Sequence, residues 1–432
     1  YGRALALKPG YAEAHQNLGI TLKVQGKLDE AAAQYRKAFA LKPGYAEAHN
    51  NLGNVLKEQG KTEEAVAQYR QALTFRPGFA DAHNNLGVAL KELGKLEEAV
   101  AHCRQALQLK PAYAEAHNNL GNMLKEQGKW EEAAACYQEA LRLKPVLAEA
   151  YNNLGHILKE KDRLDEAFVC FQRALAIRPD DVDVHINLGN ILKDQDKLDE
   201  ARVHYQRVWE LRPTDGLQIL LATLLPAIAT SKEEVLAIRR NFQQQVSRLL
   251  SRGLSLEDPV KEVGTTNFYL AYQGFNDRDI QQSVSRLYER ACPSLLYTAP
   301  HCASGARSAH SGKVVIGFVS HYFRQHSIGK YMRGLIANLS RDQFHVIVFF
   351  VPPVKDDDLS AFFRRSADQA VVLPGALQSA RERIADEKVD VLVYPDIGME
   401  SFTYFLAFSR LAPVQCVSFG HTVTTGIRKI DY

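Results

Sequence analysis

The sequence has few of the residues that cross-link a protein, anchor it in a bilayer or charge it strongly. Cysteine occurs six times in 432 residues, and no two cysteines stand at CxxC spacing. This usage excludes a disulfide framework and a cysteine-based zinc site. No apolar run reaches the length of a membrane-spanning helix, and the formal net charge is only +3. These absences predict an intracellular, cytoplasmic protein that binds no metal, no nucleic acid and no membrane.

A repeated segment fills the first half of the chain. Six 34-residue copies begin at Tyr11, Tyr45, Phe79, Tyr113, Leu147 and Asp181, and each closes on a Lys-Pro or Arg-Pro pair. This period is typical of tetratricopeptide repeats, in which pairs of antiparallel helices stack into a superhelix. The sequence therefore predicts an α-solenoid over residues 1–214, with six full repeats and a partial one before them.

The turn between the two helices of each repeat is marked by one position. Glycine stands there in four repeats, where a tight turn requires positive φ, and the last two repeats have aspartate, which tolerates this region better than most residues. The six residues are Gly26, Gly60, Gly94, Gly128, Asp162 and Asp196.

An asparagine recurs at one place on the first helix of every repeat. First helices line the inner surface of such superhelices, and an amide both donates to and accepts from an extended peptide backbone. We therefore predict that the column binds acceptor polypeptides, whereas the alternative is that each amide caps or bridges neighbouring helices. The column is Asn17, Asn51, Asn85, Asn119, Asn153 and Asn187.

Histidines also recur on the first helices, where they suggest shared metal sites. Equivalent positions on adjacent helices lie about 8–10 Å apart, which is too far for shared coordination. We expect packing or surface roles for His15, His49, His83, His117 and His185.

The period ends after residue 214, and residues 215–311 read as a helical connector. Helical patterns cover 233–250 and 280–291, and an aromatic segment at 265–274 ends at a turn. From residue 312 onward, short apolar runs alternate with helical patterns, which predicts a parallel, doubly wound sheet. The predicted strands are 314–319, 346–351, 389–394 and 413–419, and the predicted helices are 330–339, 377–387 and 403–409.

Polar residues follow three of these predicted strands, at 320–327, 395–398 and 420–426. Ligands of such sheets bind beyond the carboxyl ends of the strands. The last segment, Gly-His-Thr-Val-Thr-Thr-Gly, offers small residues, hydroxyls and exposed amides, which suit a diphosphate.

The combination of repeats and sheet motifs resembles the O-linked N-acetylglucosamine transferases of proteins and the related Spindly-type enzymes. The resemblance rests on the repeat array followed by 318–320, Phe323 and His326, then 411–415, Gly420, 424–426 and 431–432. It implies a GT-B-type catalytic region of two Rossmann-like lobes, of which residues 312–432 are the first. Both ends of the chain look interior, so we expect a fragment that binds peptides without turnover.

The resemblance also implies an activity and a site. The expected reaction transfers N-acetylglucosamine from UDP-GlcNAc to Ser or Thr of intracellular proteins, with the nucleotide sugar as co-substrate and no cofactor. The implied catalytic residue is His326, in an acid/base or positioning role, and its alternative is a loop histidine that bonds backbone. The implied donor-binding residues are Gly420, His421, Thr424, Thr425 and Gly426.

The chain departs from the family pattern at three positions. Asp390 stands where the animal enzymes have a second histidine, and Thr422 and Val423 replace Pro and Gly in the glycine loop. Two alternatives therefore stay open, namely a Spindly-like O-fucosyltransferase that uses GDP-fucose and a non-catalytic repeat scaffold. A homodimer formed through the repeats is a further possibility.

Overall fold

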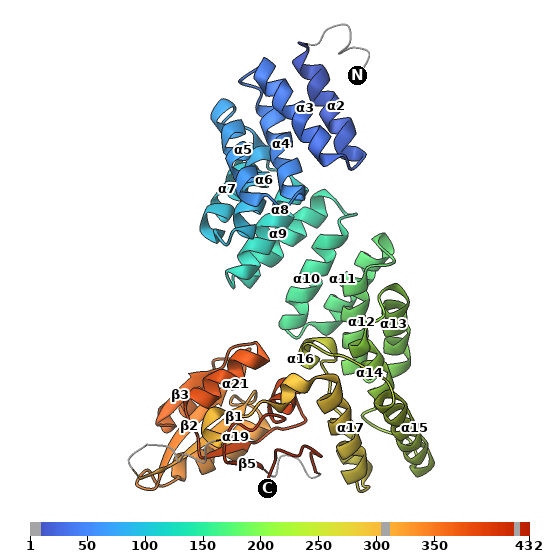
Figure 1. Ribbon diagram of the computed structural model, residues 1–432, viewed down its shortest axis with the longest axis vertical. Coiled ribbons are helices and arrows are strands. Elements are labelled where there is room, and N and C mark those ends of the chain that lie inside the picture. The colour runs from blue at the N-terminus through green and yellow to red at the C-terminus, as the bar shows by residue number, and fades with distance from the viewer. Residues whose placement is uncertain (1–9, 304–311, 419–423) are drawn as a thin grey trace. The chain divides into compact units, whose positions relative to one another are not determined.

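The computed structural model describes residues 10–303, 312–418 and 424–432, and these residues form helical repeats followed by a small parallel sheet (Figure 1). The predicted fold class, a tetratricopeptide solenoid followed by a Rossmann-like lobe, is confirmed. The chain divides into two compact units, residues 1–191 and residues 192–432. The predicted boundaries at 214 and 311 stay predictions.

The repeats form six pairs of helices, as their period predicts. Each first helix has 13 residues and each second helix has 14. The pairs are α2 (Ala12–Val24) with α3 (Leu28–Leu41), α4 (Ala46–Glu58) with α5 (Thr62–Phe75), α6 (Ala80–Glu92) with α7 (Leu96–Leu109), α8 (Ala114–Glu126) with α9 (Trp130–Leu143), α10 (Ala148–Glu160) with α11 (Leu164–Ile177), and α12 (Val182–Asp194) with α13 (Leu198–Leu211).

Close approach of the two helices in a pair depends on one glycine. A Cβ at Gly53 would lie 2.5 Å from Cε1 of Tyr69, a fully buried ring on the second helix. Alanines such as Ala48 and Ala65 complete the interface. Large side chains would hold the helices apart, so the small residues set the spacing within each repeat.

The turns between paired helices have the predicted backbone. The four glycines have φ of 72–75°, and Asp162 and Asp196 have φ of 60° and 59°. The glycine positions and their aspartate replacements are therefore explained by the left-handed conformation that the turn requires.

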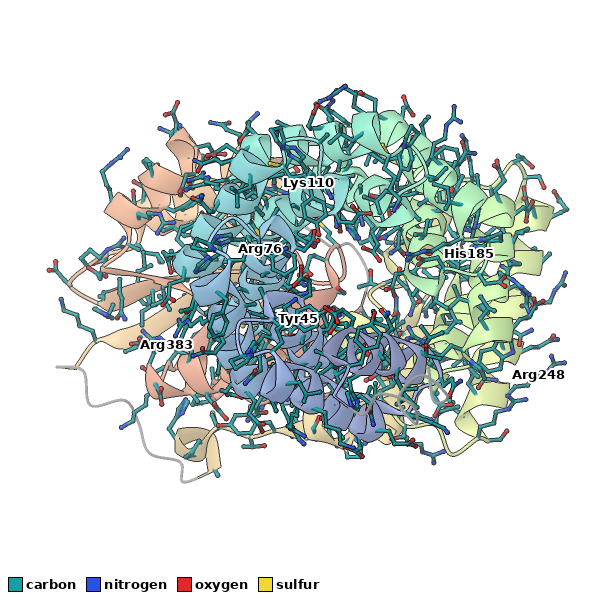
Figure 2. All side chains as sticks on the ribbon, turned by 90° about the horizontal axis from the view of Figure 1, so that it is seen from above. Tyr45, Arg76, Lys110, His185, Arg248 and Arg383 are labelled. Atoms are coloured by element: carbon teal, nitrogen blue, oxygen red, sulfur yellow. The ribbon has the colours of Figure 1, made fainter. Side chains whose placement is uncertain are left out.

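Ion pairs at the surface also join the two helices within a repeat. Arg76, labelled in Figure 2, places its guanidinium 3.7 Å from the centre of the Phe79 ring and pairs with Glu47 at 2.7 Å. Arg178 and Glu149 form the equivalent pair at 3.2 Å. Exposed pairs of this kind contribute about 0–1 kcal/mol each, so the alanine-rich core remains the main source of stability.

The connector is helical, and both of its predicted helices are confirmed. Its elements are α14 (Asp215–Thr223), α15 (Lys232–Leu250), α16 (Pro259–Glu262), η1 (Phe268–Gln273), α17 (Arg278–Ala291), η2 (Pro293–Leu296) and α18 (Pro300–Ala303). The predicted turn after the aromatic segment is Gly274, with φ of 70°. A buried ion pair connects α15 to the residue before α17, with Arg239 Nη1 donating to Asp277 Oδ1 at 2.6 Å.

Five parallel strands form the sheet, in the order β3-β2-β1-β4-β5. The strands are β1 (Val314–Ser320), β2 (Phe344–Phe350), β3 (Gln369–Val372), β4 (Val391–Tyr394) and β5 (Val414–Val417), and the helices between them are α19 (Ser327–Asn338), α20 (Asp358–Ser366), α21 (Leu377–Asp386) and α22 (Ser401–Leu406). β1 and β2 are buried along most of their length, as strands covered on both faces are.

The structure corrects the sequence prediction at several elements of the sheet. The sequence analysis missed β3 and α20 altogether, and α19 begins at Ser327 rather than at Lys330. The last predicted helix was also placed too late, because α22 spans Ser401–Leu406. Among the helices that the structure describes, none combines the length and the apolar composition needed to cross a bilayer.

Candidate functional site

The loops after β1 and β4 are joined by hydrogen bonds at the carboxyl edge of the sheet. Ser320, the last residue of β1, donates its hydroxyl to Asp396 Oδ2 at 2.9 Å, and the backbone N of His321 donates to the same oxygen at 3.1 Å. The backbone N of Tyr322 donates in turn to Ser320 Oγ at 2.8 Å. The start of the β1–α19 loop is therefore fixed by a carboxylate from the neighbouring strand's loop.

Asp396 is a fully buried carboxyl group. Burial raises its pKa to about 7, although the bonds from Ser320 and His321 act in the opposite direction. Its other oxygen, Oδ1, has no hydrogen-bond partner in the described part of the chain. Burial also raises the pKa of Glu400, whose side chain caps α22 by accepting from the backbone N of Phe402 and Thr403.

His326 is the N-cap residue of α19. Its Nδ1 accepts from the backbone N of Ile328 at 3.3 Å, and its ring stacks on Tyr322 with 4.2 Å between centroids. Burial, followed by the positive charge of Arg324, lowers its pKa, so the imidazole is neutral near pH 7. Because Nδ1 accepts a hydrogen bond, the proton of the neutral ring lies on Nε2. The alternative interpretation of His326 was a loop histidine that bonds backbone, and such a bond is present. Nε2–H is the group of the ring that could bind a ligand.

A second histidine in this loop is more buried. The pKa of His321 is lowered to about 4, first by burial and then by Arg324, whose Nη2 lies 3.4 Å from His321 Nε2. His321 and Asp396 both lie in segments that the sequence analysis placed after strands, but their burial had no signal in the sequence.

The loop after β5 is described only in part. Gly420 and His421, with Thr422 and Val423, lie outside the described residues. Thr424 Oγ1 accepts from the backbone N of Gly426 at 3.3 Å, and Thr425 Oγ1 accepts from the backbone N of Ile427 at 3.2 Å. Both hydroxyls therefore accept hydrogen bonds within the loop itself.

Gly426 packs directly on α17. Its φ is 68°, and a Cβ there would lie 2.4 Å from the carbonyl carbon of Gln281. Only glycine fits this contact, which fixes the end of the loop. A pocket of about 400 Å³ beside it is lined by Thr424, Thr425, Gly426, Arg278, Arg428 and neighbouring residues. In the described part of the chain, no hydrogen bond or ion pair joins these residues to His326.

Two other motif residues hold the fold together. Gln415 is fully buried and donates Nε2 to the backbone oxygens of Ser409 (3.0 Å) and Lys429 (2.9 Å). Asp431 accepts from the guanidinium of Arg410 at 2.5 and 3.1 Å and from the backbone N of Gln415 at 2.8 Å. These residues therefore attach the segment after β5 to the strand.

Asp390 lies away from the candidate site. Its Oδ2 accepts from the backbone N of Val315 at 2.8 Å, at the start of β1 and just before β4. This is the amino edge of the sheet. Asp390 therefore joins β1 to the segment before β4, at the edge opposite the candidate site.

In the repeats, the asparagine column bridges neighbouring helices. Asn85, Asn119, Asn153 and Asn187 donate Nδ2 to an asparagine 35 residues earlier, at 2.9–3.4 Å. The acceptors are Asn50, Asn84, Asn118 and Asn152. The bridging alternative is therefore observed for these four, and peptide binding by the column stays a prediction.

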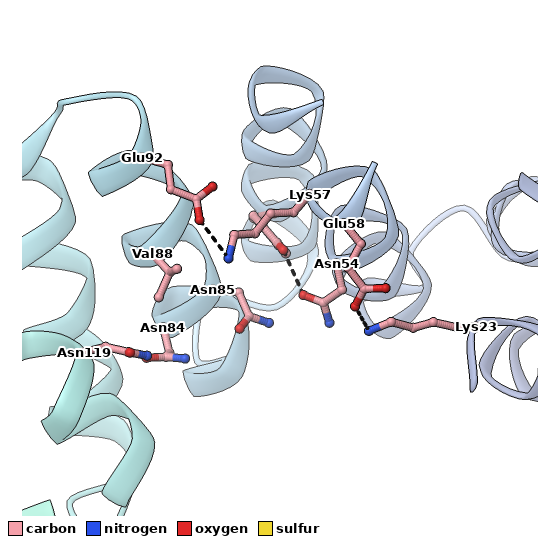
Figure 3. Close-up of a pocket in the computed structure, with 10 residues that line it drawn as sticks. Lys23, Asn54, Lys57, Glu58, Asn84, Asn85, Val88, Glu92 and Asn119 are labelled. Carbon is pink, nitrogen blue, oxygen red and sulfur yellow. Dashed lines mark hydrogen bonds and ion pairs between the residues drawn. The ribbon is translucent and has the colours of Figure 1, made fainter. Parts of the chain in front are cut away.

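The first helices of this array line a pocket of about 460 Å³, shown in Figure 3. Its walls combine amides (Asn54, Asn84, Asn85, Asn119) with two ion pairs, Lys23–Glu58 at 2.8 Å and Lys57–Glu92 at 3.0 Å. Tyr69 donates its hydroxyl to Asn54 Oδ1 at 2.8 Å. Amide groups and side chains of both charges thus line this surface, and they offer both hydrogen-bond donors and acceptors.

The repeat histidines have packing roles. His117 and His185 bond through Nε2 to the backbone oxygens of Pro111 and Pro179, and His49 stacks on Phe39. No group of three His, Cys, Asp or Glu side chains among the described residues could hold a metal ion.

Comparisons with known proteins cover both parts of the chain. The family described as Cilia and flagella-associated protein 70 C-terminal domain matches residues 4–217. A UDP-glucose:protein N-beta-glucosyltransferase from Actinobacillus pleuropneumoniae serotype 5b (strain L20) is 23% identical over 158 residues, which are 36% of this chain and 25% of that protein.

A solved structure adds a likeness of fold. A mutant O-GlcNAc transferase from Thermobaculum terrenum superposes with a TM-score of 0.51 at 19% identity, over 74% of this chain and 52% of that one. The chain thus spans about a quarter of the curated relative and about half of the solved structure. The chain therefore consists of tetratricopeptide-type repeats and an α/β lobe, with weak similarity to glycosyltransferases.

Proposed function

We propose that this chain is the acceptor-binding array and first catalytic lobe of a protein O-glycosyltransferase. Its donor would be UDP-GlcNAc and its acceptors Ser and Thr hydroxyls of proteins. The observation that carries the proposal is the neutral, partly buried His326 at the carboxyl edge of a parallel sheet, in a loop fixed by Ser320 and Asp396. Ligands of such sheets bind at this edge.

The tautomer of His326 favours a positioning role over that of a general base. A neutral ring whose Nδ1 accepts from Ile328 has only a donor, Nε2–H, to offer a substrate. That donor suits an oxygen of the sugar or of the diphosphate. In the reaction, the acceptor oxygen would bond to the anomeric carbon while the bond to the diphosphate breaks, and the bonding electrons would leave with the nucleotide. The proton of the acceptor hydroxyl would pass to an oxygen of the departing diphosphate.

The pocket beside Gly426 suits the diphosphate. Arg278 and Arg428 both line it, together with the hydroxyl-bearing loop at Thr424 and Thr425. Guanidinium groups bind phosphate oxygens in pairs of hydrogen bonds. The name of the A. pleuropneumoniae relative supports a UDP-sugar donor and a protein acceptor, whereas GDP-fucose remains the alternative donor.

Transfer by the complete protein tests this proposal. We would offer UDP-GlcNAc, UDP-glucose and GDP-fucose with protein acceptors and follow the acceptor mass. We expect addition of N-acetylhexosamine, and at least a ~100-fold slower rate for His326→Ala, because removing one aligned donor costs about this much. His345→Ala is the matched control, since His345 lies at the start of β2 on the opposite edge. Absence of transfer from all three donors would refute the proposal and favour the scaffold alternative.

We further propose that the asparagine column holds the acceptor polypeptide. In Asn85 and Asn119 one Nδ2 hydrogen bridges helices, while the second hydrogen and the oxygen can reach a peptide backbone. Asn153 donates Nδ2 to both Asn118 and Asn122, so its oxygen is the group that can reach a peptide. The bridging partners Asn50, Asn84 and Asn118 are buried. Asn85, Asn119 and Asn153 are only half-buried, so they are the ones that can reach a ligand, whereas Asn187 of the same column is buried.

This difference in burial supplies a matched pair of variants. Alanine at Asn85, Asn119 and Asn153 and alanine at Asn50, Asn84 and Asn118 both remove the bridges, so both should lower stability by about 1 kcal/mol per bond. Only the first set should weaken peptide binding, by at least ~10-fold, measured by fluorescence anisotropy of labelled acceptor peptides. Equal binding by the two variants would assign the column to helix bridging alone.

A further inference from the structure

A third pocket lies between the last helix of the repeats and the helices that follow it. It has a volume of about 390 Å³ and is lined by residues of α13, α14 and α15 and of the segments that follow α14 and α15. This size falls in the range of small-molecule sites, roughly 300–1,000 Å³. It shares no lining residue with the sheet edge or with the pocket beside Gly426.

The pocket is strongly cationic. Three arginines line it, Arg202, Arg248 and Arg252, and none of the lining residues is acidic. Arg248, labelled in Figure 2, and Arg252 stand four residues apart at the carboxyl end of α15, and both side chains are exposed. Arg202 is held across the pocket by a hydrogen bond from Nη1 to the backbone oxygen of Leu221 at 3.2 Å.

These arginines differ from those of the earlier repeats. Arg70 and Arg104 each pair with a glutamate of the next repeat, at 3.2 and 3.5 Å. Within the described residues, no carboxylate pairs with Arg202, Arg248 or Arg252. Unpaired guanidinium groups gathered in a concave surface focus a positive potential and favour a phosphate, which they bind bidentately.

The rest of the lining suits a flat heterocycle. Trp209, half-buried on α13, provides an aromatic face. Four amide side chains, Gln206, Gln218, Asn241 and Gln245, offer both donors and acceptors. Leu221, Leu224 and Leu249 add apolar contacts.

We propose that this arginine pocket is a nucleotide-binding site separate from the candidate active site. The three guanidinium groups would hold the phosphate, the indole of Trp209 would stack on the base, and the amides would bond to its edge. A site for a nucleotide on helices that bear no part of the sheet edge would allow nucleotide levels to regulate the protein without competing with the donor.

Trp209 gives the site its own reporter. The chain has only two tryptophans, and Trp130 is an exposed residue of α9, so Trp130→Phe leaves Trp209 as the sole source of tryptophan fluorescence. In this background we would titrate UMP, uridine and inorganic phosphate. We expect saturable quenching by UMP with a dissociation constant below ~1 mM, and binding at least ~10-fold weaker for uridine and for phosphate.

Variants separate this site from its surroundings. The double variant Arg248→Ala/Arg252→Ala should weaken UMP binding by at least ~10-fold, while Arg240→Ala, an exposed arginine of α15 outside the pocket, should not. His326→Ala should leave the Trp209 signal unchanged, so failure of the proposed transferase would not affect this result. Circular dichroism would confirm that each variant is folded.

Several outcomes would overturn the proposal. If inorganic phosphate bound as tightly as UMP, Trp209 would not stack on a base. If uridine bound as tightly as UMP, the arginines would not bind the phosphate. Unchanged UMP binding in the double variant, or no saturable quenching by ~10 mM UMP, would refute the nucleotide site. The arginines would then serve only to interact with the last carbonyl groups of α15. A phosphoserine peptide that bound in place of UMP would also contradict it.

Discussion

Replacing Arg239 by alanine is expected to lower the free energy of unfolding of residues 192–432 by about 3–5 kcal/mol. Arg239 is 8% exposed, and its guanidinium donates to Asp277 Oδ1 at 2.6 Å and to the backbone oxygen of Asn276 at 3.0 Å. Asp277 is 2% exposed. The variant would therefore leave a buried carboxylate without its counter-charge.

Urea unfolding followed through Trp209, in the Trp130→Phe background, measures this effect. Arg240→Ala, on the adjacent exposed residue, should change stability by less than ~0.5 kcal/mol. The double variant Arg239→Met/Asp277→Leu should recover most of the loss, because replacing both charges with apolar groups removes the unpaired carboxylate. A loss below ~1 kcal/mol for Arg239→Ala would show that water reaches Asp277.

Asp396→Asn is expected to stabilise the same unit above pH 7 and to have little effect near pH 4. The pKa of Asp396 is raised to about 7 from 3.8, chiefly by burial. Between these two values the unfolded chain releases a proton that the folded chain keeps, so stability falls as pH rises through this window and stays reduced above it. Asparagine does not ionise and can still accept from Ser320 and His321, so the gain at pH 8 should be on the order of 2–4 kcal/mol.

Asp431→Asn provides a control of opposite sign. Burial acts to raise the pKa of Asp431, but the hydrogen bonds from Arg410 and from the backbone of Gln415 outweigh it and leave the pKa below its ordinary value. The ionised carboxylate of Asp431 therefore stabilises the fold at pH values above the ordinary pKa of aspartate. This stabilisation is lost as the pH falls through the lowered pKa of the folded protein. Urea unfolding at several pH values should show Asp431→Asn losing stability at neutral pH while Asp396→Asn gains it. A pH-independent effect of Asp396→Asn would contradict the burial argument.

The helix pairs of the repeats and the turns between them could be predicted because every signal in them occurs six times. The sheet was harder, since each strand occurs once. β3 has only four residues, Gln369–Val372, and lies at the edge of the sheet, so it lacks the long apolar run that identified β1 and β2. α20 begins at the last of three aspartates that follow a proline pair, a segment typical of a loop, although Asp357 caps the helix.

The position of the β1–α19 and β4–α22 loops at the carboxyl edge of the sheet could be predicted from the sequence, but the geometry of these loops could not. Histidine is not among the preferred N-cap residues, so the sequence did not predict that His326 caps α19. The hydrogen bond from the backbone N of Ile328, which fixes the tautomer of the ring, was therefore not predicted either. Nothing in the sequence distinguishes a buried Asp396 from an exposed one. The close packing of Gly426 on Gln281 depends on a connector 145 residues earlier, which no local pattern reveals.

The constant 35-residue offset of the asparagine bridges bears on how such a chain can evolve. Each bridge joins a residue to the position just before its own counterpart in the preceding repeat, as Asn119 joins Asn84 and Asn153 joins Asn118. If recombination removed the 34 residues 79–112, Asn119 would meet Asn50, another asparagine, and the bond would form again. The array can therefore gain or lose whole repeats without losing the bridge between the repeats that become neighbours.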